Sequence, residues 1–262
     1  MRAATLEAHQ LRLQRLARSS RGQLYALLAG DPAESAAWVA SAAHCGVPAA
    51  QLCLGRLLLE GRGVTRSATS AFRWFTRAAA RGDAEAMNMV GRCHENGWGV
   101  PQNLALAAAS YRRSAEAGHD WGQYNLGNLL FDGRGLARDQ GQALRWYLQA
   151  AHQGHGRAMN LVGRCLEEGW GCARNLEEAA YWYERSAERG YFRGQFNHAL
   201  TLAQRGSTAS AAMWFWRAAV GGDEDLRHTI VAVLERATDP ALRQLQARVR
   251  ALPPARLARQ VS

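Results

Sequence analysis

A repeat of 36 residues runs through most of this chain and constrains its fold more than any other feature. Glycine and alanine columns keep this interval over four successive units. The glycines are Gly55, Gly91, Gly127 and Gly163; Gly61, Gly97, Gly133 and Gly169; Gly63, Gly99, Gly135 and Gly171; and Gly82, Gly118, Gly154 and Gly190. The alanines are Ala71, Ala107, Ala143 and Ala179, then Ala79, Ala115, Ala151 and Ala187. Units of this length stack against each other, because a single unit cannot bury its own apolar face.

Each unit has the pattern of two helices joined by a tight turn. The first helix is expected from about residue 50 to residue 60, and at the equivalent positions of later units, and it ends at a Gly-x-Gly turn. Glycine adopts the positive φ that stops a helix. The next helix begins at a column of polar residues that can cap it, namely Ser67, Asn103, Asp139 and Asn175.

The composition fits an all-helical protein with a sizeable core. Hydrophobic residues make up 48% of the 262 residues, and Ile230 is the single isoleucine, so strand-forming residues are scarce. We expect neither a signal peptide nor a membrane-spanning segment. The five cysteines form no CxxC pair, so we expect reduced thiols, a cytoplasmic location and no cofactor.

The net charge of +10 lies mainly at the two ends of the chain. Residues 1–21 hold five arginines and one acid, and residues 236–262 hold six arginines and one acid. Lysine is absent, so all 32 basic residues are arginines, for which codon bias is the simplest explanation. Nucleic-acid binding is therefore not the first expectation; association of the Arg-rich ends with nucleic acid or a membrane surface is an alternative.

The phase of the repeat sets the expected segment boundaries. We expect an Arg-rich helical cap at residues 1–32, a solenoid at 33–222, capping helices at 223–252 and a tail at 253–262. The solenoid begins with a single second helix at 33–46, followed by repeats at 50–85, 86–121, 122–157, 158–193 and 194–222. The last repeat has lost its Gly-x-Gly turn, as terminal repeats that cap a stack often depart from the consensus.

Two segments, AAQLCLGRLLLEGRGV and GQALRWYLQAAHQG, resemble the Sel-one-like repeat (SLR) family, a relative of tetratricopeptide repeats. The resemblance covers residues 33–222. It implies an all-α, right-handed α/α superhelical solenoid of about five helix-turn-helix repeats with helical caps, and a concave groove lined mainly by first helices. It also implies a non-enzymatic scaffold or adaptor that binds another protein. We expect a bacterial monomer, and similar repeats in proteins encoded beside iron-uptake receptors give a further alternative, an accessory role in iron uptake.

The second and fourth repeats form a matched pair. Residues 86–104 agree with 158–176 at thirteen positions and with 122–140 at only three. The shared motif is AMN[ML]VGRCxExGWG. Its spacing of i, i+4 and i+7 places an Asn, an Arg and a Glu on one stripe of the first helix. These residues are Asn88, Arg92 and Glu95 in the second repeat and Asn160, Arg164 and Glu167 in the fourth.

We expect this polar stripe to face the groove and bind a partner protein of unknown identity. Trp98 and Trp170 would lie at its rim, and Tyr124 and Asn128 would be the contribution of the third repeat, because Arg and Trp are favoured anchors at interfaces. The alternative is that a two-repeat block was duplicated and that the polar residues serve stability alone.

Other residue groups have simpler interpretations. Cys93, Cys165 and Cys172 lack the spacing of a metal site and are expected to be buried thiols. His119 and His155 share a turn column and are expected at the surface. A chain without lysine has no SxxK nucleophile, and no other catalytic set appears, so no enzyme is expected.

Overall fold

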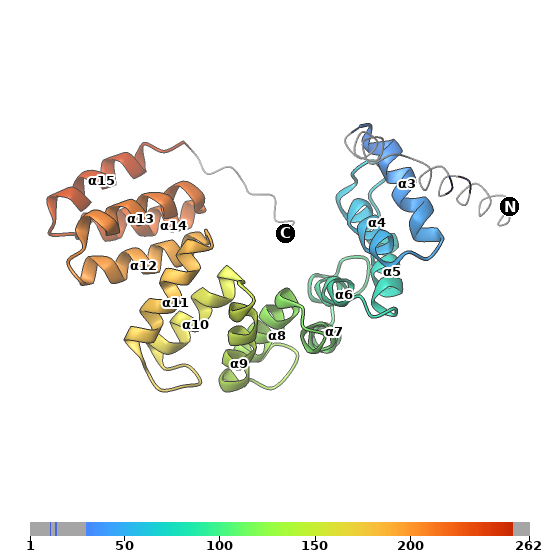
Figure 1. Ribbon diagram of the computed structural model, residues 1–262, viewed down its shortest axis with the longest axis horizontal. Helices are drawn as coiled ribbons and strands as arrows, with labels where there is room; N and C mark the ends of the chain where they lie inside the picture. The colour runs from blue at the N-terminus through green and yellow to red at the C-terminus, as the bar shows by residue number, and fades with distance from the viewer. Residues whose placement is uncertain (1–10, 12–13, 15–29, 254–262) are drawn as a thin grey trace. The chain divides into compact units, whose positions relative to one another are not determined.

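The computed structural model describes residues 11, 14 and 30–253, so the expectations for most of residues 1–29 and for the tail after 253 lie outside it. Within the described residues every regular element is an α-helix (Figure 1). The chain divides into two compact units, residues 1–138 and residues 139–262. The expected all-α architecture of helix-turn-helix repeats is therefore confirmed for this part of the chain.

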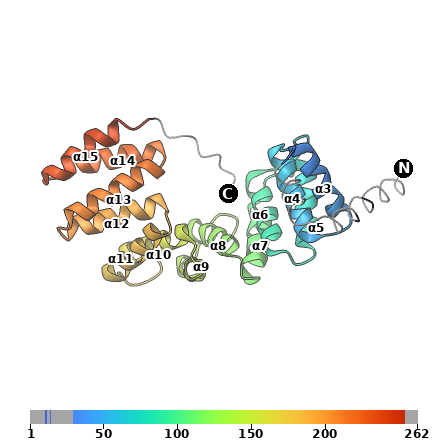
Figure 2. The ribbon, with the colours of Figure 1, turned by 45° about the horizontal axis from the view of Figure 1, so that its top comes forward.

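The first unit holds six of these helices. They are α3 (Pro32–His44), α4 (Pro48–Glu60), α5 (Ala68–Ala79), α6 (Ala84–Asn96), α7 (Leu104–Glu116) and α8 (Asp120–Asp132). Within this unit each helix packs against the next one (Figure 2), and α6 also contacts α8 directly. The first helices α6 and α8 therefore lie side by side within this unit.

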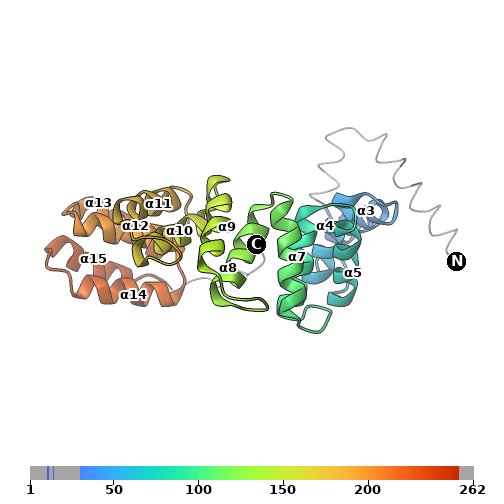
Figure 3. The same cartoon turned by 90° about the horizontal axis from the view of Figure 1, so that it is seen from below.

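The second unit repeats this arrangement and then departs from it. Its helices are α9 (Gln140–His152), α10 (Gly156–Glu168), α11 (Leu176–Glu188), α12 (Phe192–Gln204), α13 (Thr208–Gly221), α14 (Glu224–Glu235) and α15 (Pro240–Arg250). α10 contacts α12 as α6 contacts α8. At the C-terminal end α13, α14 and α15 pack together around Phe215, Ile230 and Leu245 (Figure 3).

The helix ends are where the repeat pattern placed them. The first helix of each of the four regular repeats ends at a glycine with φ between 71° and 77°, for example Gly97 and Gly169. The polar column before the second helices caps them: the side chain of Asn103 accepts from the Leu106 N–H, and that of Asn175 accepts from the Glu178 N–H. Both predictions, the glycine stops and the polar caps, are confirmed.

A glycine inside α4, α6 and α10 lets an aromatic ring pack directly on the helix backbone. A Cβ atom at Gly91 would lie 2.5 Å from the ring of Tyr111, and one at Gly163 would lie 2.6 Å from the ring of Tyr183. Both tyrosines are buried. This close approach holds these first helices against the second helices of their repeats.

The expectation that His119 and His155 are solvated surface residues is wrong. Each is the N-cap of a first helix: His119 Nδ1 accepts from the Gly122 N–H at 3.2 Å, and His155 Nδ1 accepts from the Ala158 N–H at 3.1 Å. His155 is buried and His119 half-buried. A histidine in the turn column replaces the aspartate that caps α6 at Asp83.

Candidate partner-binding surfaces

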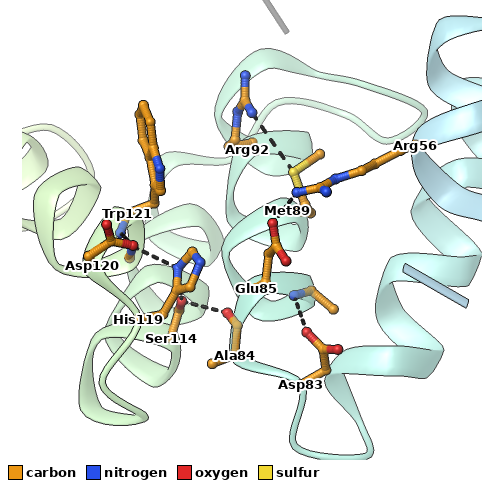
Figure 4. A network of polar contacts seen from close by, with 12 residues as sticks. Arg56, Asp83, Ala84, Glu85, Met89, Arg92, Ser114, His119, Asp120 and Trp121 are labelled. Carbon is orange, nitrogen blue, oxygen red and sulfur yellow. Dashed lines mark hydrogen bonds and ion pairs between the residues drawn. The ribbon is translucent and has the colours of Figure 1, made fainter. Parts of the chain in front are cut away.

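Arg92 and Trp98 form a stacked pair at the C-terminal end of α6. The guanidinium carbon lies 5.1 Å from the centre of the indole, and the Arg92 Nη1 lies 3.9 Å from the sulfur of Met89 (Figure 4). The Trp98 backbone N–H donates to the carbonyl of Cys93, which fixes the turn that carries the indole. Both side chains are half-buried, so each presents one side to solvent.

The same pair recurs in the second unit. The Arg164 guanidinium carbon lies 5.1 Å from the Trp170 ring centre, and the Trp170 N–H donates to the carbonyl of Cys165 at 2.9 Å. Arg164 is exposed and Trp170 half-buried. A cation–π contact of this kind contributes only about 0.5–1 kcal/mol at an exposed site. Its main effect is to orient a guanidinium whose N–H groups can then bind a carboxylate.

The two asparagines of the motif are structural. Asn88 and Asn160 are each 4% exposed, and each Oδ1 accepts from an asparagine on the next first helix, Asn125 and Asn197 respectively, at 2.8 Å. A buried amide that loses its partner costs about 1–3 kcal/mol, so these bonds fix the register between neighbouring first helices. The asparagines are thus not available at the surface where the sequence had suggested them.

Each of the two glutamates accepts a hydrogen bond from a tyrosine on the second helix of its own repeat. Tyr111 donates to Glu95 Oε2 at 2.6 Å, and Tyr183 donates to Glu167 Oε2 at 2.5 Å. Burial, reinforced by the adjacent glutamate, raises the pKa of both tyrosines well above the ordinary value, so they stay protonated donors. Glu95 also pairs with Arg134 at 3.2 Å.

The third repeat adds aromatic surface beside Arg92. Tyr124 and Trp121 meet edge to face with ring centres 5.9 Å apart on α8, and both are half-buried, as is Asn128 one turn later. In Figure 4 the side chains of Arg92 and Trp121 project toward the same side of the unit. Sequence reasoning missed Trp121, because its column holds Glu85, Arg157 and Arg193 in other repeats and gave no consensus to depart from.

Two of the five cysteines are core packing residues, whereas Cys45 and Cys53 are exposed. Cys93 and Cys165 are buried, as predicted, and burial raises the pKa of each thiol to about 12. Cys172 is half-buried. Across residues 30–253 no cluster of three or more histidine, cysteine, aspartate or glutamate side chains has the arrangement of a metal site. The described helices are also too short and too polar to cross a membrane.

A family model described as "Sel1 repeat" matches residues 48–83, 84–119, 122–155 and 156–191, more than half of the chain. The chain belongs to the Sel1 repeat family. Proteins with these repeats generally mediate protein–protein interactions as non-enzymatic scaffolds. The resemblance inferred from the repeat columns is thereby confirmed. No protein in a search of curated sequences matches this chain.

Solved structures with the same repeats match the fold. The protective antigen c5321 of uropathogenic Escherichia coli, which displays an SLR fold, is 31% identical with a TM-score of 0.69 over 84% of this chain. This chain spans 48% of the length of that antigen. A Sel1 repeat protein from Oxalobacter formigenes is 25% identical with a TM-score of 0.70, over 87% of this chain and 99% of that one. The immunity protein Pa5087 from Pseudomonas aeruginosa, 15% identical over 78% of this chain and 79% of its own with a TM-score of 0.51, shares the fold.

Proposed function

We propose that this Sel1 repeat protein is a monomeric cytoplasmic scaffold that binds a partner protein through two Arg–Trp surfaces, one in each unit. The first consists of Arg92 and Trp98 with Trp121, Tyr124 and Asn128. The second consists of Arg164 and Trp170. The five free cysteines suit a reducing compartment.

The observation that carries the proposal is that the residues of the repeated motif have two different roles. Its asparagines and glutamates are bonded to other parts of the protein, whereas its arginines and tryptophans turn toward solvent in the same stacked geometry in both units. A motif that served stability alone would not need the exposed pair. Arg and Trp are also the residue types that most often anchor interfaces.

The chemistry of the surface defines the partner. A stacked guanidinium binds a carboxylate with two donors in one plane, and the indole beside it covers an apolar side chain. We therefore expect a partner segment in which an acidic residue lies next to an apolar one. Because the pairs are already oriented, binding orders few groups of the receptor, and its entropic cost falls mainly on the partner.

Affinity capture from the native cytosol tests the proposal. The wild type is compared with an Arg92→Glu, Arg164→Glu double variant and with a matched Arg112→Glu, Arg145→Glu double variant. The control changes the net charge equally and alters exposed arginines on second helices, one in each unit. We expect one defined protein retained by the wild type and the control and lost from the Arg92, Arg164 variant.

The salt dependence of capture separates the alternatives. Nucleic acid or lipid recovered by all three forms and released as salt rises would assign the activity to the Arg-rich ends, because phosphate contacts are strongly screened. A partner that all three forms retain equally would refute the proposed surfaces. An iron-uptake component among the retained proteins would identify the pathway without changing the surface.

A further inference from the structure

A pocket of about 460 Å³ lies in the first unit, away from the motif on α6. It opens where the C-terminal end of α3, the start of α4 and the C-terminal end of α5 meet. The residues that matter for its chemistry are His44, Gly46, Gln51, Trp74, Arg77 and Arg81. Its wall holds two arginines and no acidic residue, so the pocket favours an anionic ligand.

Gln51 supplies the decisive feature. Its side chain is 5% exposed, and its Nε2 donates to the Ala43 carbonyl at 3.2 Å, which fixes the orientation of the amide. The Oε1 is buried and has no hydrogen-bond partner among the described residues, and Gln51 is one of the residues that line the pocket. A buried acceptor without a donor costs about 1–3 kcal/mol, so a ligand with an N–H group would gain from meeting it.

The two arginines are held in place by the protein itself. The Arg77 guanidinium carbon lies 4.6 Å from the Trp74 ring centre, and Arg81 donates one N–H to the Gly46 carbonyl. Each of these contacts engages one part of a guanidinium that has five donors. Trp74 is itself braced by His44, whose ring meets it edge to face at 4.9 Å.

We propose that this pocket binds the C-terminal residue of a peptide. Its carboxylate would accept from Arg77 and Arg81, its backbone N–H would donate to Gln51 Oε1, and its apolar side chain would contact Trp74. The dianion of a phosphate monoester satisfies the arginines but has no donor for Gln51.

The aromatic and basic residues around the pocket occur a second time in the chain, and comparing the two copies shows which residue gives the pocket its specificity. Residues 108 positions later, in the second unit, rebuild it with His152, Gly154, Trp182, Arg185 and Arg189, and His152 meets Trp182 edge to face at 5.4 Å. There Met159 stands in the place of Gln51. The aromatic and basic frame is thus compatible with packing alone, and the buried acceptor is the added element.

The third repeat gives the complementary comparison. Gln123 makes the same bond as Gln51, from its Nε2 to the Ala115 carbonyl at 3.3 Å. Gln149 and Gln153 replace the two arginines at that junction. Of these three junctions, the one around Trp74 alone combines the glutamine with both arginines.

The test is a titration of the full chain followed by NMR at the Trp74 indole N–H, assigned with a Trp74→Phe variant. The probes are N-acetyl-leucine, its C-terminal amide and its N-methyl derivative, which lacks the donor. We expect the amide to bind at least about tenfold more weakly than the acid, since a charged hydrogen bond contributes about 1.5–3 kcal/mol. The N-methyl derivative should bind about three- to tenfold more weakly, the value of one neutral hydrogen bond.

The Gln51→Met variant, combined with the N-methyl ligand, completes a double-mutant cycle. Methionine is chosen because Met159 occupies the equivalent position in the second unit. In this variant N-acetyl-leucine should lose the same three- to tenfold, and N-methylation should cost nothing further. Equal binding of acid and amide, or loss on N-methylation that persists in Gln51→Met, would overturn the proposal. So would methyl phosphate, as its dianion, that shifts the indole signal as strongly as N-acetyl-leucine.

Two further probes identify the source of the carboxylate. N-acetyl-glycyl-leucine, which mimics a protein C-terminus, should bind at least as well as N-acetyl-leucine; free leucine, whose ammonium faces the arginines, should bind more weakly. Tighter binding of free leucine would overturn the assignment to a peptide. The choice of a peptide as the ligand rests on the proposed protein-binding function. Arg92 and Arg164 are unchanged in these experiments, so the pocket proposal and the Arg–Trp proposal can fail independently.

Discussion

The second repeat and the fourth repeat carry one motif in two different settings. Both have the stacked Arg–Trp pair, the Tyr–Glu bond and the Asn–Asn bond to the next first helix. Only Glu95 is also paired with an arginine, Arg134; the position 72 residues later is Gly206, and Glu167 has no ion pair among the described residues. The fifth repeat has lost its Gly-x-Gly turn, and the arginine of that turn went with it.

This difference separates the contacts that both copies of the motif share from the ion pair that only the second repeat has. The ion pair is absent from one copy, whereas the three shared contacts are intact in both. The buried part of the motif therefore consists of the asparagine and tyrosine bonds, and the Arg–Trp pair is what both copies present to solvent. Four sets of substitutions test this comparison, beginning with the change expected to cost most.

Alanine at Gly91 or Gly163 should destabilise either repeat by about 3 kcal/mol, because a Cβ atom would overlap the tyrosine ring that packs there. The midpoint of urea unfolding gives the measurement. Gly118→Ala is the control: its φ is 86° but nothing lies within 4 Å of the added Cβ, so it should cost only about 1–2 kcal/mol. Equal costs at all three positions would mean that the ring contact is not what the glycine column serves.

Asn88→Leu should cost about 2 kcal/mol, because it leaves the amide of Asn125 without its acceptor. The first junction holds Leu52 and Met89 at the corresponding positions. The double change Asn88→Leu, Asn125→Met should therefore recover most of the loss in thermal stability. A double variant as unstable as the sum of its parts would contradict a purely structural role for the pair.

Tyr183→Phe should cost about 1.5 kcal/mol and Tyr111→Phe about half of that, because Glu95 keeps Arg134 when it loses the hydroxyl and Glu167 keeps no ion pair. The raised pKa of both tyrosines adds a pH signature. Their protonated form stabilises the fold below pH of about 10, and that contribution falls as pH rises further. Each Tyr→Phe variant should lose less stability than the wild type between pH 9 and pH 11.

Arg134→Ala should have the smallest effect, about 0.5 kcal/mol in dilute buffer and close to none in 1 M salt, because Arg134 is 45% exposed. Thermal unfolding at the two salt concentrations measures it. The double variant Arg134→Ala, Tyr111→Phe leaves Glu95 with neither partner, as Tyr183→Phe leaves Glu167. The loss of stability caused by Tyr111→Phe in the Arg134→Ala background should therefore equal that caused by Tyr183→Phe in the wild type. A much larger single effect would make the ion pair, and not the tyrosine bond, the main support of Glu95.

The sequence predicted the repeat, the helix ends and the matched motif because each depends on residues at fixed spacing. Glycine stops and polar caps are local, so one column identifies them. The roles inside the motif depend on partners elsewhere in the chain: Asn88 bonds to a residue 37 positions later and Glu95 to one 16 positions later. The tyrosines at 111 and 183 give no specific signal for the glutamate contact, because Tyr147 fills the same column in the third repeat, where Phe131 replaces the glutamate.

His155 is a single residue whose role could not be predicted from the sequence for the same reason. A histidine in a turn column of a solenoid has the pattern of a surface residue, and its capping bond becomes visible only when the next helix is in place. Gln51 is comparable, since its isolation as a buried acceptor depends on three helices meeting.

The two Arg–Trp pairs are proposed to bind the partner. Once the partner is captured, its dissociation constant should be measured for the wild type, for Arg92→Glu and Arg164→Glu singly and together, and for the Arg112→Glu, Arg145→Glu control. We predict a loss of about tenfold or more for each single variant, a larger loss for the double variant and no change for the control, since a charge-assisted hydrogen bond contributes roughly 1.5–3 kcal/mol. Equal dissociation constants for all four variants and the wild type would contradict the account.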